Sequence, residues 1–369
     1  MLAALLRRRW LLVPAVLVAL VALVGGVVVL SGGAGAPPPA AAGDRPAGTG
    51  TVVATAGIVY ADRLVVYNGR SHYGDEQVFL DFEAATGVDV ELRGGTGPEL
   101  FQRLQQEGAD TPADVLITTD VANLWRAEEA GLLQGVTSET LRSQIPEGLH
   151  EPDGHWWAVS TRVRVPVVST ERVPAGAVTS YDDLADPQFR GRTCLRTSNS
   201  EYNQSLVADM IAKRGAPATE ALLRSWMANE PDILGSDGEM LAVMAAGDCD
   251  LGLSNHYYLG RALAEDPAFP VAPAWPDQDG AGAHANVSGA GVVASSDAVP
   301  TAVALLEWLT SPPAQEQIIA RSEFAANPVV PPAPHIRDWA DVRIDPIAVE
   351  EVGPLLDDAV AMMLAVGWN

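Results

Sequence analysis

Cysteine and positive charge are both scarce in this sequence. Only Cys194 and Cys249 occur among its 369 residues, and neither lies in a CxxC or another spacing typical of zinc thiolates. Lysine and arginine number 23 against 47 aspartates and glutamates, so the formal net charge is -24. Phosphate binding needs clustered cations, and this balance therefore argues against a nucleic-acid partner. GxSxG, HExxH and phosphate-cradling glycine patterns are also missing, which disfavours an enzyme.

The first fifty residues differ in composition from the rest. Arg7, Arg8 and Arg9 precede an apolar run over residues 10–30, which is long enough to span a bilayer. Positive charge before such a run keeps the N-terminus in the cytoplasm and directs the remainder outward. We interpret residues 1–50 as a signal peptide or a membrane anchor, followed by a tether rich in Gly, Ala and Pro. Either interpretation predicts an exported, extracytoplasmic protein, in the periplasm or at the cell surface.

Export would place the two cysteines in an oxidising compartment. In an oxidising compartment, two cysteines suggest one disulfide, here between Cys194 and Cys249. Two buried free thiols are the alternative.

Beyond residue 60, β-branched runs alternate with amphipathic segments, a pattern typical of an α/β fold with open sheets. The first series predicts strands at residues 63–67, 88–92 and 113–117, alternating with helices at 75–86, 98–107 and 121–130. Such a βαβαβα order predicts a parallel sheet. A second series spans residues 193–264, and the extended stretches at 155–169 and 285–294 are placed to connect the two series.

We therefore expect two doubly wound lobes that are joined by two hinge strands and separated by a cleft. The expected division is an N-terminal lobe of residues 60–161 and 284–345, a C-terminal lobe of residues 162–283, and a C-terminal tail of residues 346–369.

Tyrosines gather where predicted strands lead into helices. The chain has seven tyrosines, and four of them lie at three such corners: Tyr73 beside His72, Tyr202, and the pair Tyr257 and Tyr258. In open α/β sheets, ligands bind beyond the carboxyl ends of the strands. The distribution therefore predicts a binding site built from phenol groups.

Phenolate oxygen is a hard, anionic donor that suits ferric iron, whereas calcium and magnesium favour carboxylates and zinc favours Cys and His. Four phenolates around Fe3+ leave one surplus negative charge, for which Arg162, Arg164 and Arg261 are candidate counter-charges. Arg164 is also open to a simpler interpretation as a solvated strand residue. His256, which precedes the tyrosine pair, is expected to face solvent or to cap the helix.

Several blocks of the sequence resemble successive segments of a known family. They are HYGDEQ, PADVLITTDVANLWRAEEAGLL, GHWWAVSTRVRV, SYDDLADPQFRGR, NSEYNQSLVA, GLSNHYYLGRAL and HANVSGAGVV. These blocks are similar to those of the ferric-iron-binding periplasmic proteins of ABC transporter solute-binding protein family 1, in particular the cyanobacterial type with a tyrosine-rich iron site. The likeness runs from about residue 63 to about residue 330.

The resemblance implies a type 2 periplasmic-binding-protein fold. Carried over by position, the iron ligands are Tyr73, Tyr202, Tyr257 and Tyr258, with His72 matching a histidine that is a ligand in some members and only adjacent in others. Arg162 and Arg261 match arginines that lie beside the metal in the family. The N-terminal segment and the portion from residue 331 onward depart from the family pattern, and we expect them to affect localisation and docking rather than the metal site.

The resulting hypothesis is an extracytoplasmic, monomeric substrate-binding component of an ABC importer. It would capture Fe3+, alone or with a synergistic anion such as carbonate or citrate, and deliver it to a permease with a cytoplasmic ATPase. Alternatives are a solute-binding protein for another small ligand, such as a phosphonate or a thiamine-like cation, and a membrane-tethered iron sensor. Fe2+ is retained as an alternative cargo to Fe3+.

Overall fold

The computed structural model describes residues 60–369 with the exception of residues 72, 73, 75 and 347. The predicted signal or anchor segment and its tether lie outside the described residues. Within the described part of the chain, no helix is long and apolar enough to cross a membrane.

The first series of elements follows the predicted order. Its members are β1 (Arg63–Asn68), α1 (Gln77–Thr86), β2 (Asp89–Gly94), α2 (Gly97–Glu107), β3 (Val115–Thr118) and α3 (Val121–Glu129). Strand β1 lies between β2 and β3 and is parallel to both, as predicted. Local sequence explains the helix ends: α1 ends at Gly87, whose φ of 80° is left-handed, and Thr96 with Glu99 forms a capping box at the start of α2.

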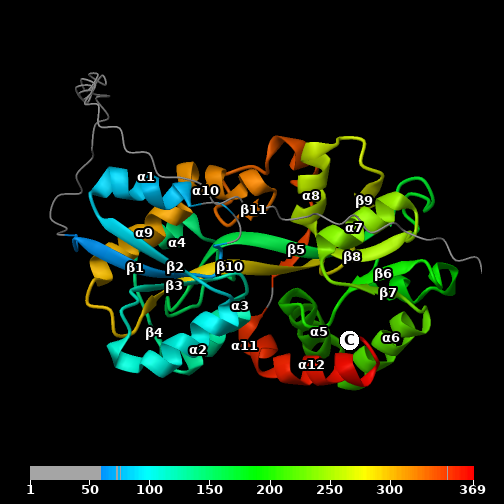
Figure 1. Ribbon diagram of the computed structural model, residues 1–369, viewed down its shortest axis with the longest axis horizontal. Helices are drawn as coiled ribbons and strands as arrows, with labels where there is room; N and C mark the ends of the chain where they lie inside the picture. Colours follow the sequence, from blue (N-terminus) through cyan, green and yellow to red (C-terminus); the bar gives the residue numbers. More distant parts are fainter. Residues whose placement is uncertain (1–59, 72–73, 75, 347) are drawn as a thin grey trace, which may run out of the picture. The chain divides into compact units, whose positions relative to one another are not determined.

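Shorter elements complete this part of the structure. They are β4 (Leu133–Gln134), α4 (Glu139–Gln144), α9 (Val299–Thr310), α10 (Pro312–Ile318) and β11 (Phe324–Ala325). Helices α1, α9 and α10 lie on one side of the β1–β3 sheet, and α2 lies on the other (Figure 1).

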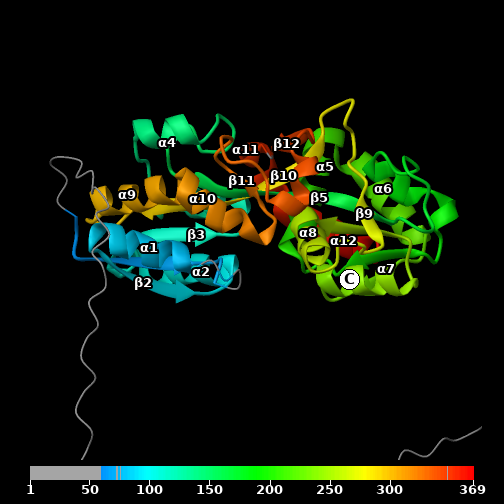
Figure 2. The ribbon, with the colours of Figure 1, turned by 90° about the horizontal axis from the view of Figure 1, so that it is seen from above.

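Two long strands connect the two series of elements. They are β5 (Trp157–Ser169) and β10 (Ala283–Val293), and every residue of both strands is buried. The two strands pair antiparallel as far as Val163 and Ala285, after which β5 pairs with β8 (Leu251–Asn255), beginning with Arg164 opposite Asn255. Both views show β5 and β10 passing between the two groups of helices (Figures 1 and 2).

The second series occupies the predicted residues 193–264 and continues to a short strand at Val271–Pro273. Besides β8 it comprises β6 (Thr193–Arg196), α5 (Glu201–Arg214), α6 (Ala216–Ala228), β7 (Asp232–Leu234), α7 (Asp237–Ala246), α8 (His256–Glu265) and β9 (Val271–Pro273). Strand β6 is parallel to both β7 and β8. The sheets are therefore mixed, because β5 and β10 run antiparallel to their neighbours β8 and β3.

The C-terminal segment is folded against the second series. It contains β12 (Ile344–Pro346), α11 (Val349–Val352) and α12 (Leu356–Ala365), and α12 packs along α5. Trp368 is fully buried, contacts Trp226 at 6.0 Å between ring centroids, and donates a hydrogen bond from Nε1 to the Arg196 carbonyl at 2.8 Å. Short 3-10 segments occur at Gly108–Asp110, Tyr181–Ala185, Pro187–Phe189, Ile319–Arg321, Pro334–Trp339 and Gly353–Leu355.

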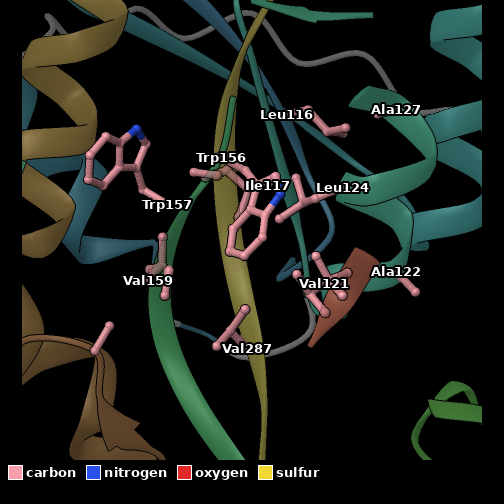
Figure 3. Packing of buried hydrophobic residues seen from close by; sticks show 14 of the residues in the cluster. Leu116, Ile117, Val121, Ala122, Leu124, Ala127, Trp156, Trp157, Val159 and Val287 are labelled. Carbon is pink, nitrogen blue, oxygen red and sulfur yellow. The ribbon is translucent and has the colours of Figure 1, made fainter. Parts of the chain in front are cut away.

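Apolar side chains from β3, α3, β5 and β10 pack together on the two faces of the first sheet. Ile117 and Leu124 are completely buried, and Trp157 is completely buried on the opposite side of β5 (Figure 3). Dense packing of this kind fixes the strand ends, and it thereby fixes the side chains that project from them.

Candidate functional site

Two of the three predicted corners lie side by side. Strand β6 leads into α5, whose second residue is Tyr202, and β8 leads into α8, whose second and third residues are Tyr257 and Tyr258. Because β6 and β8 are neighbouring parallel strands, their carboxyl ends meet at one edge of the sheet. His72 and Tyr73, which form the third corner after β1, lie outside the described residues.

The structure brings the three described tyrosines into contact. The Tyr257 hydroxyl donates a hydrogen bond to the Tyr202 hydroxyl at 3.3 Å. The rings of Tyr257 and Tyr258 stack with centroids 4.5 Å apart and planes inclined by 30°. Tyr202 and Tyr257 are buried and Tyr258 is half-buried, so most of this phenol cluster is shielded from water.

Both arginines that the family resemblance selected lie over these rings. The Arg162 guanidinium carbon is 5.0 Å from the Tyr202 ring centroid. That of Arg261 is 4.8 Å from the Tyr257 centroid and 5.8 Å from the Tyr258 centroid. A cation over a phenol ring is attracted by its π face, and it stabilises the ring further if the phenol ionises.

A third arginine, Arg196, was missed by the sequence analysis. It is the last residue of β6, and its guanidinium carbon lies 5.4 Å from the Tyr202 centroid. Burial lowers the pKa of Arg196, but Asp237 and the three phenol groups outweigh burial and raise the pKa above its usual value. The residue therefore stays cationic. Its position could have identified it from the sequence, because Arg196 is the last residue of the strand that leads into the Tyr202 corner.

Arg162 is held in place by a buried carboxylate from the first series. Its guanidinium forms an ion pair with Asp120 at 3.4 Å. Asp120 also accepts hydrogen bonds from Ser205 at 2.8 Å and from Asn286 at 2.9 Å. Asp120 thus links the start of α3 to α5, to β10 and to Arg162.

A second carboxyl group lies next to the phenol cluster. Glu201 accepts a hydrogen bond from the Thr119 hydroxyl at 2.8 Å. Burial raises the pKa of Glu201, and the nearby Asp120 carboxylate raises it further, while Arg162 acts in the opposite direction.

The interpretation of Arg164 as a solvated strand arginine is wrong. It is buried and forms an ion pair with Asp237 at 3.0 Å, and it also donates to Asn203 at 2.8 Å and to Asn255 at 3.2 Å. A buried guanidinium needs a full set of hydrogen-bond acceptors. Arg164 finds some of them on Asn203 and Asn255, and it thereby fixes residues close to Tyr202 and Tyr257.

The expectation that His256 faces solvent or caps the helix is also wrong. The side chain is completely buried, and its Nδ1 accepts a hydrogen bond from the Val163 main-chain N–H at 3.0 Å. Burial lowers the pKa of His256 to about 3, and the positive charges of Arg162 and Arg261 act in the same direction. The imidazole is therefore neutral and carries its proton on Nε2.

A buried network joins the corner after β1 to Arg162. Arg70 donates to Glu323 at 2.7 Å, to Ser160 at 2.9 Å and to Ser288 at 2.8 Å. Arg162 also donates to Ser288, at 3.4 Å. Arg70 stands two residues before His72, so this network fixes the chain at the point where it enters the third corner.

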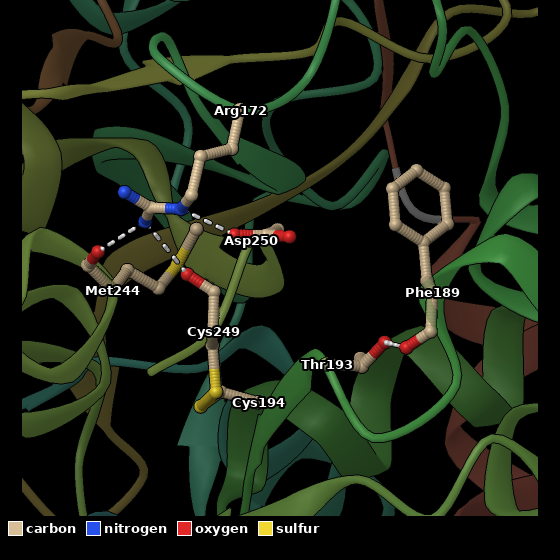
Figure 4. The surroundings of a disulfide bond; sticks show 7 residues. All are labelled: Arg172, Phe189, Thr193, Cys194, Met244, Cys249 and Asp250. Carbon is tan, nitrogen blue, oxygen red and sulfur yellow. Dashed lines mark hydrogen bonds and ion pairs between the residues drawn. A yellow bond between two sulfur atoms is a disulfide. The ribbon is translucent and has the colours of Figure 1, made fainter. Parts of the chain in front are cut away.

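The two cysteines form a disulfide at the base of β6 and β8. Cys194 and Cys249 have Cα atoms 5.9 Å apart and close a loop with a sequence separation of 55. Arg172 binds the Cys249 carbonyl at 3.2 Å and the Asp250 carboxylate at 2.5 Å beside the bridge (Figure 4). The bridge ties together the two strands whose ends carry the tyrosines.

The chain belongs to the bacterial extracellular solute-binding proteins, whose family profile matches residues 77–344. This is a family of binding proteins rather than a class of enzymes. Structural neighbours confirm the predicted type 2 periplasmic-binding-protein fold and the predicted resemblance to ferric-iron-binding members.

Its relatives include proteins of iron uptake. Iron uptake protein A1 from Synechocystis sp. is 38% identical over 314 residues, which cover 82% of this chain and 87% of that protein. The Fe(3+)-binding periplasmic protein of Serratia marcescens is 30% identical over 295 residues, and the match covers 76% of this chain and 85% of that protein. A solved Trichodesmium protein (IdiA, FutA) in complex with iron and citrate ligands has a TM-score of 0.78 at 36% identity, and the match covers 83% of this chain and 100% of that one.

Proposed function

We propose that this protein is the extracytoplasmic substrate-binding component of an ABC importer that captures ferric iron. The observation that carries the proposal is the contact of Tyr202 with Tyr257, hydroxyl to hydroxyl at 3.3 Å, with Tyr258 stacked alongside. Relatives that take up or bind ferric iron support the same cargo.

In this proposal the phenol groups of Tyr73, Tyr202, Tyr257 and Tyr258 bind Fe3+ as phenolates. Their reference pKa is about 10, so each ligand releases a proton on binding at neutral pH. His72 is assigned to the same corner as Tyr73. The guanidinium groups of Arg162, Arg196 and Arg261 offset the surplus negative charge, with a synergistic anion as an optional further ligand.

The remaining parts are assigned to capture and delivery. Residues 60–161 with 284–345 and residues 162–283 act as two lobes that close over the ion, and β5 and β10 serve as the hinge. The closed, monomeric protein delivers iron to a membrane permease that is driven by a cytoplasmic ATPase. The segment at residues 10–30 directs export, either as a cleaved signal peptide or as a membrane anchor.

The test is a titration of the purified full chain with ferric citrate. We expect one equivalent of bound iron and a broad visible phenolate-to-iron band. Tyr202→Phe and Tyr258→Phe should weaken both, whereas Tyr67→Phe should not, because Tyr67 is buried and bonded to Glu107 in the first series. A chain without the band would refute the iron assignment, and native mass spectrometry would then identify a phosphonate, a thiamine-like cation or another solute.

A further inference from the structure

The crossing strand β5 changes its pairing partner between Val163 and Arg164. Val163 is the last residue of β5 that pairs with β10, and Arg164 is the first that pairs with β8. Main-chain groups at such a change need partners from outside the two ladders, because a buried N–H without an acceptor is costly.

A side chain from the ligand-bearing helix provides one of these partners. His256 is the first residue of α8, and its Nδ1 accepts the Val163 N–H at 3.0 Å. The same ring packs against Phe324 at 4.2 Å between centroids and meets the Tyr257 ring edge-on at 6.0 Å. Phe324 belongs to β11, which itself pairs with β5. The imidazole is thus enclosed by the crossing strand, by its edge strand and by a proposed iron ligand.

A second side chain, that of Tyr181, is bonded to the main chain of β5 and β10 near the same change of pairing. The Tyr181 hydroxyl donates to the Arg164 carbonyl at 2.7 Å and accepts from the His284 N–H at 2.9 Å, so it bridges β5 and β10. Tyr181 lies in a 3-10 segment and not on α5 or α8. It therefore offers a matched control that perturbs the crossing alone.

We propose that His256 is a positioning residue that couples the crossing strand β5 to the first turn of α8, and thereby sets the placement of Tyr257. The inference rests on the proposed iron site. A ligand on the first turn of a helix keeps its geometry only if the start of that helix is fixed, and preorganised ligands lose less freedom on binding. The bond from Val163 to His256 fixes that start relative to the hinge.

The test replaces His256 in the full chain with residues that differ in whether, and where, they offer an acceptor for the Val163 N–H. His256→Asn places its amide oxygen near the position of Nδ1, whereas His256→Gln reaches toward Nε2 and His256→Phe offers no acceptor. Two readouts apply: hydrogen exchange at the Val163 amide in the iron-free protein, and Fe3+ affinity with the position of the phenolate-to-iron band.

We expect His256→Asn to retain slow exchange at Val163 and to bind iron as the wild type does. His256→Gln and His256→Phe should exchange faster, bind iron about 10- to 100-fold more weakly and shift the band. Tyr181→Phe should leave the band unshifted. Because Asn and Gln are both small polar amides, their comparison decides the matter even if His256→Phe does not fold.

Equal behaviour of the Asn and Gln variants in both readouts would overturn the inference, as would wild-type iron binding by His256→Gln. A wild-type chain that gives no iron band would refute the proposed function instead. In that case the exchange rates at Val163 would still decide whether His256 holds the crossing strand.

Discussion

Replacing Arg196 with methionine should weaken ferric iron binding without unfolding the protein. Methionine keeps much of the length of the side chain and removes the charge. The main-chain carbonyl of Arg196, which accepts the hydrogen bond from Trp368, is unaffected by the change. The variant therefore isolates the contribution of one guanidinium to the charge balance of the phenol cluster.

The size of the effect follows from the geometry. The Arg196 guanidinium carbon lies 5.4 Å from the Tyr202 ring centroid. At an effective dielectric constant of about 20, Coulomb's law gives about 3 kcal/mol for a unit negative charge at that distance. The Arg196 side chain is 20% exposed, so water and salt screen part of this energy. We expect a loss of about 1.5–2 kcal/mol, which corresponds to about 10- to 30-fold weaker binding.

The assay is competition for Fe3+ against citrate at fixed ionic strength, followed by the phenolate-to-iron band. Arg190→Met is the matched control, because Arg190 precedes the same strand but is exposed and pairs with Glu230 at the surface. Arg196→Lys should lie between the wild type and Arg196→Met. If Arg196→Met bound iron as tightly as Arg190→Met, the reasoning that Arg196 balances the phenolate charge would be refuted.

Three further predictions concern stability. Cys194→Ser opens a loop with a sequence separation of 55 and should lower the free energy of unfolding by about 4 kcal/mol under oxidising conditions, with little difference after reduction, as measured by urea denaturation. Burial raises the pKa of Glu107, but two neighbouring hydroxyl groups and Arg103 lower it to about 2. The charged form is therefore stabilised in the folded state above the ordinary carboxyl pKa, and this stabilisation is lost as the pH falls toward 2. Glu107→Gln should cost about 1–2 kcal/mol at pH 7 and converge with the wild type in acid denaturation. Trp368→Ala should cost about 3–5 kcal/mol and also weaken iron binding, whereas Trp368→Phe should retain most of the stability; thermal melts with and without iron would show both effects.

The sequence was sufficient to predict the alternation of strands and helices over residues 63–130 and the proximity of Tyr202 to Tyr257 and Tyr258. The periodic patterns are strong in both series, and strand ends in an α/β sheet necessarily meet at one edge. Tyr202 and Tyr257 could therefore be placed together although 55 residues separate them. Their contact follows from the parallel pairing of β6 with β8.

Side-chain direction at the crossing strand could not be predicted in the same way. Arg162 and Arg164 both lie on β5 and are both buried, so the expected alternation of buried and exposed residues does not apply. Arg164 is buried because Asp237, 73 residues away, neutralises it. His256 is buried because it accepts a hydrogen bond from the Val163 N–H of β5 and packs against Phe324. Both causes lie in the tertiary structure, where no local pattern records them.

The contacts of the C-terminal portion, from residue 331 onward, were also not predicted from the sequence. This portion departs from the family pattern, and we expected it to affect localisation and docking only. In the structure α12 packs along α5, the helix that carries Tyr202, and Trp368 binds the carbonyl of Arg196. The segment thus contacts both the helix that carries Tyr202 and the strand that leads into it.

The arrangement of carboxylates decides which arginine is best suited to compensate an iron–phenolate centre. Arg162 shares its charge with Asp120 at 3.4 Å. The carboxylate beside Arg196 is Asp237, which lies 3.9 Å away and already accepts two hydrogen bonds from Arg164. Arg164 thus neutralises much of the charge of Asp237, and the guanidinium carbon of Arg196 lies 5.4 Å from the Tyr202 ring centroid. A buried ion pair that takes no part in binding can in this way determine the electrostatics of the site beside it.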